Sequence, residues 1–220
     1  MITLVLASAS PARLATLRTA GIEPVVVVSD VDEDAALALA TAQAGHELSV
    51  PSQVAELAKA KARDVVGKVD LSAFGGDVLV LGCDSLLEFD GATQGKPWEP
   101  EVARERWRAM RGGSGVLHTG HYLIRVPREG EPSVASAVSS TGVQFADLDD
   151  DEIDAYVATG EPLQVAGGFT IDGYGGAFIT AIQGDHHGVI GLSLPLLRDV
   201  VREVGLRYQD LWAASHGTVS

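Results

Sequence analysis

Short apolar runs alternate along the chain with segments that have helical periodicity. The runs at 2–7 and 25–28 are typical of buried strands. Between them, Ser10 fits the cap of a helix, Pro11 its first position and Gly21 its end. Strand, helix and strand in this order predict an α/β fold.

The remaining pattern continues the alternation. Helices are expected at 35–44, 51–66, 100–110, 149–158 and 196–204, and strands at 78–89, 116–126, 134–145 and, in a glycine-rich stretch, 167–182. The strand at 78–89 ends at Asp90-Gly91, a strong hairpin signal. We expect one domain over residues 1–220, with two lobes around a cleft and a polar tail from about residue 208.

Charge and composition exclude several classes of protein. Acids outnumber Lys and Arg by 30 to 16, which gives a net charge of −14 and argues against binding nucleic acid or an anionic membrane. No run reaches the roughly 20 apolar residues of a membrane span. The single cysteine, Cys83, allows no internal disulfide. A cytoplasmic protein is the expectation, because reduced cysteine is typical of that compartment.

Four other patterns carry little chemistry. Gly91 to Pro97 is one residue short of a P-loop and has proline where the metal-binding hydroxyl should be. The Gly-Leu-Ser-Leu-Pro run at 191–195 lacks the second glycine of a nucleophile elbow. His118 and His121 are three apart on a strand and should face opposite sides, while the pair at 186–187 fits a solvated loop.

Three charged residues stand at unusual places. Lys61 interrupts the apolar stripe of the expected helix at 51–66, Asp84 ends a buried strand run, and Lys96 sits between Gly95 and Pro97. Each has a plain structural alternative. Lys61 could extend its amine to water, Asp84 could cap a turn, and Lys96 could be a surface lysine.

The first strand–loop–helix junction predicts an anion site. A helix N-terminus with free N–H groups attracts phosphate, and Ser8, Ser10 and Arg13 add further donors there. An acid, two lysines, an arginine and this junction together suit hydrolysis of a phosphoanhydride, in which a metal ion activates water.

These blocks resemble the Maf family of nucleoside triphosphate pyrophosphatases. The matching segments are Ser8 to Arg13, Val31 to Glu33, Ala60 to Ala62, Gly82 to Ser85, Gly95 to Pro97, His118 to Gly120, Gly160 to Leu163, Ala166 to Phe169 and Val189 to Leu192.

The resemblance implies a strongly twisted mixed sheet like that of inosine triphosphate pyrophosphatases, a homodimer, and cleavage of a nucleoside triphosphate to monophosphate and pyrophosphate. It implies Mg²⁺ or Mn²⁺ as cofactor, held by Glu33 and Asp84, with Asp84 as base or metal-linked carboxylate. Lys61 and Lys96 would be catalytic residues, together with Asp84, and would bind phosphate. Ser8, Ser10 and Arg13 would bind phosphate as well. It also implies a link to septum formation.

Three positions differ from those of the resembling family in ways that bear on which nucleotide base is preferred. The branch acting on dTTP and UTP has arginine, threonine and glutamine where this chain has Ala12, Ser85 and Asp172. The branch acting on 7-methylguanosine triphosphate matches Ala12 and Asp172 better but has glutamine at position 85. Asp172 could instead only set a turn. Two other functions stay open: a nucleotide-binding regulator of division without catalysis, and a hydrolase of another phosphate ester.

Overall fold

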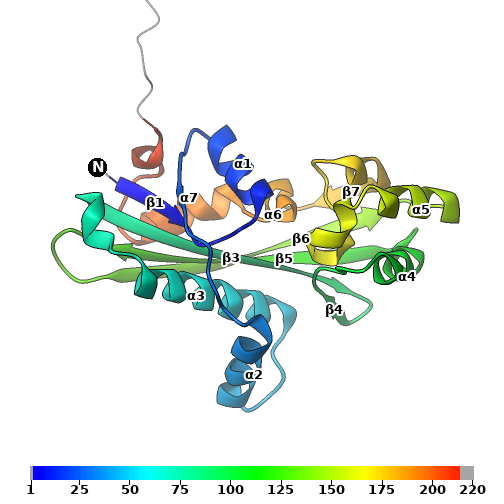
Figure 1. Cartoon of the computed structure of the whole chain (residues 1–220), viewed down its shortest axis with the longest axis horizontal. Helices are drawn as coiled ribbons and strands as arrows, with labels where there is room; N and C mark the ends of the chain where they lie inside the picture. The colour runs from blue at the N-terminus through cyan, green and yellow to red at the C-terminus, as the bar shows by residue number, and fades with distance from the viewer. Residues whose placement is uncertain (1, 214–220) are drawn as a thin grey trace, which may run out of the picture.

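Three long antiparallel strands, β3 (Asp77–Phe89), β5 (Ser114–Val126) and β6 (Ser133–Phe145), form the centre of the sheet. The computed structural model describes residues 2–213, in which seven strands make one sheet in the order β2-β1-β3-β5-β6-β7, with β4 also paired to β3. Helices lie on both faces (Figure 1). The predicted mixed α/β fold is confirmed.

The edge of β3 has a gap at which Asp84 lies. β1 (Ile2–Leu6) runs parallel to residues 77–81 of β3, with β2 (Val25–Val26) outside it. On the same side, β4 (Ala92–Gln94) pairs with residues 87–89. Residues 82–86 therefore have no strand partner there, which leaves backbone groups free for side chains or a ligand.

The helices divide between the two faces. In Figure 1, α1 (Pro11–Thr19), α6 (His186–Ile190) and α7 (Leu194–Glu203) lie on one side of the sheet, and α3 (Val50–Lys68) on the other, with α2 (Glu33–Ala44) beyond it. At the far end are α4 (Pro100–Met110) and α5 (Asp150–Ala158). Within residues 2–213, no helix has the length and apolar character needed to span a membrane.

Two hydrophobic clusters share one face of β3. One contains Leu79 and Leu81 with residues of α1 and α7, and the other contains Leu87 with residues of α4 and α5. Ser85 separates them, and β-pairing places Thr119 and then Ser139 beside it. Apolar packing on this face therefore stops on either side of a polar row, which divides the core into two parts.

Several expectations are wrong. The run at 25–28 is not a buried strand: only the two-residue β2 forms there, and Val25 and Val26 are exposed. The glycine-rich stretch at 167–182 is not a continuous strand: it forms 3₁₀ turns at Ala166–Gly168 and Tyr174–Phe178 before the short β7 (Ile179–Gln183). Gly167 and Gly168 have positive φ, which an extended strand does not allow. The polar tail does not begin near 208, because Tyr208–Leu211 forms a 3₁₀ turn that buries Leu211. Residues 214–220 of the expected tail lie outside the described residues. Two further 3₁₀ turns are Leu71–Phe74 and Glu161–Gln164.

Gly82 allows α3 to lie directly on the sheet. A Cβ at this position would lie 2.1 Å from the carbonyl oxygen of Ala58 and 2.9 Å from the amide nitrogen of Ala62. We expect Gly82→Ala to lower the free energy of unfolding by about 1–3 kcal/mol, because overpacking forces the backbone to shift. Gly67→Ala is the control: no atom lies within 4 Å of a Cβ there, so this helical position should gain roughly 0.5–1 kcal/mol. Urea unfolding measures both, and a Gly82→Ala variant as stable as the wild type would contradict the close packing.

Candidate active site

A lysine bridges two carboxylates at the gap in the sheet edge. The Nζ atom of Lys61 lies 2.5 Å from an Asp84 oxygen and 2.7 Å from a Glu33 oxygen. The side chains of Lys61 and Asp84 are 12% and 8% exposed, whereas Glu33 is 54% exposed. The amine thus ends on two acids rather than in open water, and it brings together residues from α2, α3 and β3.

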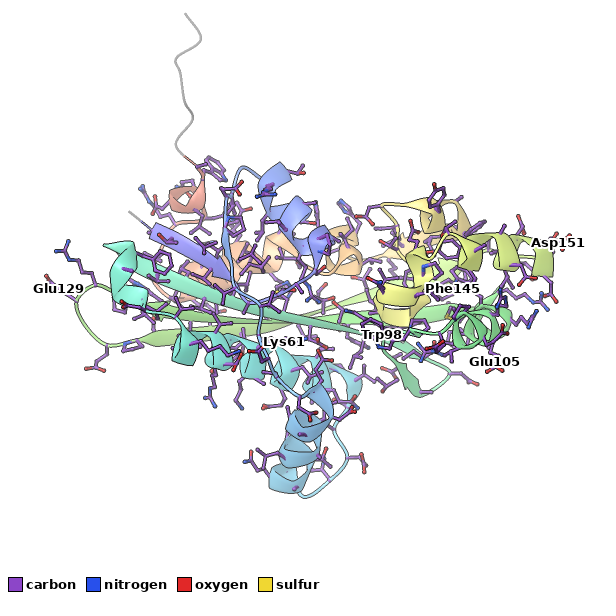
Figure 2. All side chains as sticks on the ribbon, in the orientation of Figure 1. Lys61, Trp98, Glu105, Glu129, Phe145 and Asp151 are labelled. Carbon is purple, nitrogen blue, oxygen red and sulfur yellow. The ribbon has the colours of Figure 1, made fainter. Side chains whose placement is uncertain are left out.

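The position of Asp84 follows from the close approach of α3. Asp84 is two residues beyond Gly82, so its side chain leaves β3 on the same face, toward α3. The backbone of Ala58 and Ala62 lies against Gly82, and Lys61 lies between these two residues in the sequence of the helix. Figure 2 shows Lys61 near the middle of the long axis of the molecule.

Burial dominates the ionisation of Asp84. Removal from water raises the pKa of this carboxyl above its usual range, while the positive charges of Lys61 and Arg13 act in the opposite direction. A carboxylate with a raised pKa is a better proton acceptor than an ordinary one. The environment of Asp84 therefore suits a general base as well as a metal ligand.

Arg13 connects α1 to the strand gap and to α6. Its guanidinium donates to Ser8 Oγ at 3.0 Å and to Ser85 Oγ at 3.0 Å. It also donates to the carbonyl of Cys83 at 2.9 Å and to that of Gly191 at 2.8 Å. Ser10 caps α1, as expected, by accepting from the amide of Arg13. The N-terminus of α1 is thus held next to Asp84, with Ser8 and Arg13 at its mouth.

Lys96 lies within electrostatic range of the same charges. Burial lowers its pKa most, and the positive charges of Arg13 and Lys61 lower it further. The negative charges of Glu33 and Asp84 raise it. Its Nζ atom lies 4.9 Å from the centre of the Trp98 ring, a cation–π arrangement. Lys96 is exposed, as its plain structural alternative expected, and its charge acts on the same groups as the Asp84 cluster.

The residues expected to select the base occupy different places. Ser85 belongs to the Arg13 network and also contacts Thr119 Oγ1 at 2.8 Å. Ala12 lies in the first turn of α1, where its carbonyl accepts from Thr16 Oγ1. Asp172 is exposed in a loop and accepts a hydrogen bond from Thr170 Oγ1. Its carboxylate therefore has free acceptor positions toward solvent.

Sequence reasoning gave no individual role to Thr119 and His121. Thr119 is fully buried, contacts Ser85 and donates to the carbonyl of Gly188, which joins β5 to α6 beneath Arg13. His121 accepts from the amide of Ser193 at 2.9 Å, so its other ring nitrogen carries the proton and donates to the Thr119 carbonyl. A polar side chain repeated on the core-facing side of an apolar strand is the signal that could have identified both residues.

His121 should make the fold sensitive to acid. Burial, with the charge of Arg13, lowers its pKa from 6.5 to about 4. A histidine whose pKa is lower in the folded state stabilises the fold above pH 6.5, and this contribution is lost as the pH falls from 6.5 toward 4. The loss should reach about 3 kcal/mol at pH 4. Unfolding at several pH values would measure it. His121→Gln, which keeps an acceptor for Ser193, should show a smaller decline, and equal declines would contradict this origin.

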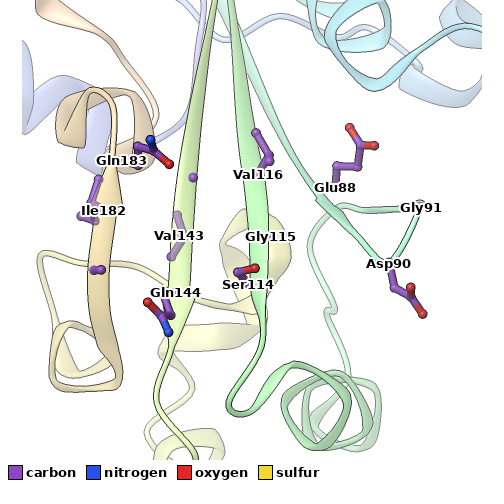
Figure 3. A pocket seen from close by; sticks show the side chains of 12 residues that line it. Glu88, Asp90, Gly91, Ser114, Gly115, Val116, Val143, Gln144, Ile182 and Gln183 are labelled. Carbon is purple, nitrogen blue, oxygen red and sulfur yellow. The ribbon is translucent and has the colours of Figure 1, made fainter.

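His118, His186 and His187 do not belong to the Asp84 cluster. As predicted, His118 points away from His121: it contacts Ser140 Oγ at 2.8 Å and Glu88 at 3.1 Å. Glu88 also borders a groove of about 520 Å³ over β5, β6 and β7 (Figure 3). That groove contains none of the predicted site residues. His186 and His187 open the short α6, where the carboxylate of Asp185 already caps the amides of His187 and Gly188.

A helix N-terminus, two lysines and an arginine lie near a buried acid, a grouping that is typical of a phosphoanhydride hydrolase. The chain belongs to the Maf-like family, because the sequence model of the family described as "Maf-like protein" matches residues 3–204. A protein named nucleoside triphosphate pyrophosphatase from Leifsonia xyli subsp. xyli is 54% identical over 209 residues, which cover 95% of this chain and 96% of that protein. A protein of the same name from Rhodococcus opacus is 50% identical, with 98% of each chain covered.

This chain is also similar to one solved structure, that of the nucleoside-triphosphatase / dITP/XTP pyrophosphatase of Mycobacterium abscessus. It covers 93% of this chain and 94% of its own, with 16% identity and a TM-score of 0.32.

Proposed function

We propose that this chain hydrolyses a nucleoside triphosphate to a nucleoside monophosphate and pyrophosphate. The family and the names of its relatives support the enzyme class predicted from the sequence. The observation that carries the proposal is the buried Asp84 carboxylate, bridged through Lys61 to Glu33 beside the Arg13 junction.

The residues support a division of labour. Asp84, with its raised pKa, accepts a proton from the water that attacks the α-phosphate. Lys61 and Lys96 balance negative charge as it moves onto the leaving pyrophosphate. Ser8, Ser10 and the N-terminus of α1 bind phosphate oxygens, while Arg13 holds this junction against the sheet.

The donor set also fits a divalent cation. Glu33 and Asp84 offer carboxylate oxygens, the ligands that Mg²⁺ and Mn²⁺ prefer, and they already converge on one positive group, Lys61. A bound ion would neutralise phosphate charge and lower the pKa of water. Metal dependence is therefore part of the proposal, with these two residues as the ligands from the protein.

The test is a screen of all common nucleoside triphosphates for pyrophosphate release, with Mg²⁺ and with Mn²⁺. Hydrolysis in ¹⁸O-water should place the label on the monophosphate, as attack at the α-phosphate requires. Label in free phosphate would indicate a hydrolase of another kind, and tight binding without turnover would indicate a regulator. The predicted homodimer and the link to septum formation stay predictions, the first of which light scattering would test.

Asp172 should favour guanine over thymine or uracil. Its carboxylate only accepts hydrogen bonds, and guanine offers two donors on one edge, whereas thymine and uracil offer one donor between two acceptors. A mispaired polar edge costs about 1–3 kcal/mol where the bound base buries it, so guanine-type triphosphates, including the 7-methylated form, should exceed dTTP and UTP in kcat/KM by roughly 5- to 150-fold.

Asp172→Gln should narrow this preference, because an amide can both donate and accept. Glu129→Gln, in the loop between β5 and β6, is the matched charge control and should leave it unchanged. If dTTP and UTP are the best substrates of the unmodified protein, this role of Asp172 is wrong.

A further inference from the structure

Arg106 differs in its ion pairing from the other arginines of α4 and from Arg111, which caps the helix. Arg104 pairs with Glu101 and Asp154, and Arg108 and Arg111 both pair with Asp150. Among the residues that the structure describes, no acid forms an ion pair with Arg106. Its one hydrogen bond runs from a terminal guanidinium nitrogen to the carbonyl oxygen of Gly95, at 2.6 Å.

This cation is also partly withdrawn from water. Burial lowers the pKa of Arg106, although a guanidinium stays charged at any pH that the protein meets. Partial burial of a charge without an opposite charge costs free energy that a leucine or methionine in the same place would not cost. Packing alone therefore does not explain an arginine at this position.

The acceptor of Arg106 belongs to the loop that carries Lys96. The Gly95 carbonyl also accepts from the amide of Gly167 at 3.1 Å, so two donors fix the residue that precedes the lysine. Two residues after the lysine, the amide of Trp98 donates to the carbonyl of Leu163 at 3.0 Å. Lys96 thus lies between two residues, Gly95 and Trp98, whose backbones are held by hydrogen bonds. Arg106 supplies the one charged donor among these contacts.

The next residue of α4 ties the same elements together. Trp107 is fully buried and donates from its ring nitrogen to the carbonyl of Gly168 at 2.9 Å. The helix thus reaches the Lys96 loop through Arg106 and the supporting 3₁₀ turn through Trp107. Since Trp107 already provides the apolar anchor, Arg106 can be removed without opening the core.

We propose that Arg106 is a positioning residue that holds the 95–98 loop so that Lys96 faces the phosphate site. It acts through the Gly95 carbonyl and need not touch the substrate. The inference rests on the proposed function for its kinetic consequence, but the ordering of the loop is independent of that function.

The test compares Arg106→Met, Arg106→Lys and, as control on the same helix, Arg108→Met. Amide hydrogen exchange of the peptide covering 94–99 should become faster in Arg106→Met and stay near wild type in the other two, because lysine can still donate to Gly95. Melting temperatures should stay within a few degrees of each other. Unchanged exchange in Arg106→Met would overturn the proposal even if the chain hydrolysed no nucleotide.

Kinetics on the active enzyme give a second readout. Arg106→Met should lower kcat/KM by about 10- to 100-fold, the scale expected when a catalytic group is misplaced by about an ångström. Combined with Lys96→Met, it should cause no further loss, because both variants remove the same contribution. Losses that multiply in the double variant, or an equal loss in Arg108→Met, would contradict an action through Lys96.

Discussion

Replacing Asp84 with asparagine should lower kcat by about 10² to 10⁴, the range of general-base contributions, while the protein stays folded. Asparagine has the same shape and can still accept the hydrogen bond from Lys61, but it cannot take a proton from water. Stability should hold or rise, because the burial that raises the pKa of Asp84 disfavours a charged carboxylate, and asparagine carries no charge. Pyrophosphate release at saturating substrate measures the effect.

A matched control lies on the same strand. Glu88 is four residues further along β3, so it leaves the strand on the same face, but its carboxylate contacts His118 rather than Lys61. Glu88→Gln should keep full activity and pyrophosphate as product. An Asp84→Asn enzyme that keeps more than a third of the wild-type rate would exclude Asp84 as base and as metal anchor.

Replacing Lys61 with methionine should lower activity by roughly 10²-fold or more, as when one charge-stabilising donor is removed. Methionine keeps most of the apolar stem but deletes the amine that faces Asp84 and Glu33. It also leaves the buried Asp84 without its nearest cation, so stability at neutral pH should fall by about 3–5 kcal/mol unless the carboxyl takes up a proton.

The double variant Lys61→Met/Asp84→Asn separates the two effects. It removes the unpaired buried charge and should therefore recover the melting temperature, but it should remain inactive. Thermal unfolding and a pyrophosphate assay on all three variants form the experiment. If Lys61→Met loses stability but keeps its activity, the lysine has a structural role only.

Local signals identified most of the elements. Ser10 and Pro11 mark the start of α1, and the apolar runs mark β1 and β3, because capping and periodicity act over a few residues. The stretch at 167–182 failed because glycines have no side chains that alternate between faces. The left-handed conformation of Gly167 and Gly168 is not compatible with a strand at this point of the chain.

The site could be predicted as a set of residues but not as an arrangement. Lys61 could be identified because a lysine interrupts an apolar stripe. Its partner Asp84 is 23 residues away, and the two side chains meet only because Gly82 lets α3 lie close to the sheet. The contact between Arg13 and Ser85 spans 72 positions. Such contacts depend on the packing of whole elements, which no local pattern encodes. The hydrogen bonds of Thr119 to Gly188 and of His121 to Ser193 could not be predicted for the same reason.

The hydrogen bond from Arg13 to the Gly191 carbonyl has a consequence for synthesis of the chain. It joins positions 178 residues apart, so the contacts that hold the first helix are not complete until residue 191 has left the ribosome. β1 also shares its hydrophobic cluster with α7, the last α-helix among the described residues. Contacts this distant in sequence are slow to form, because a long loop must close before they stabilise anything. A nascent chain stalled before residue 191 would hold Lys61 and Asp84 but lack the complete Arg13 network, so we expect nucleotide binding to begin only after residue 191 has been made.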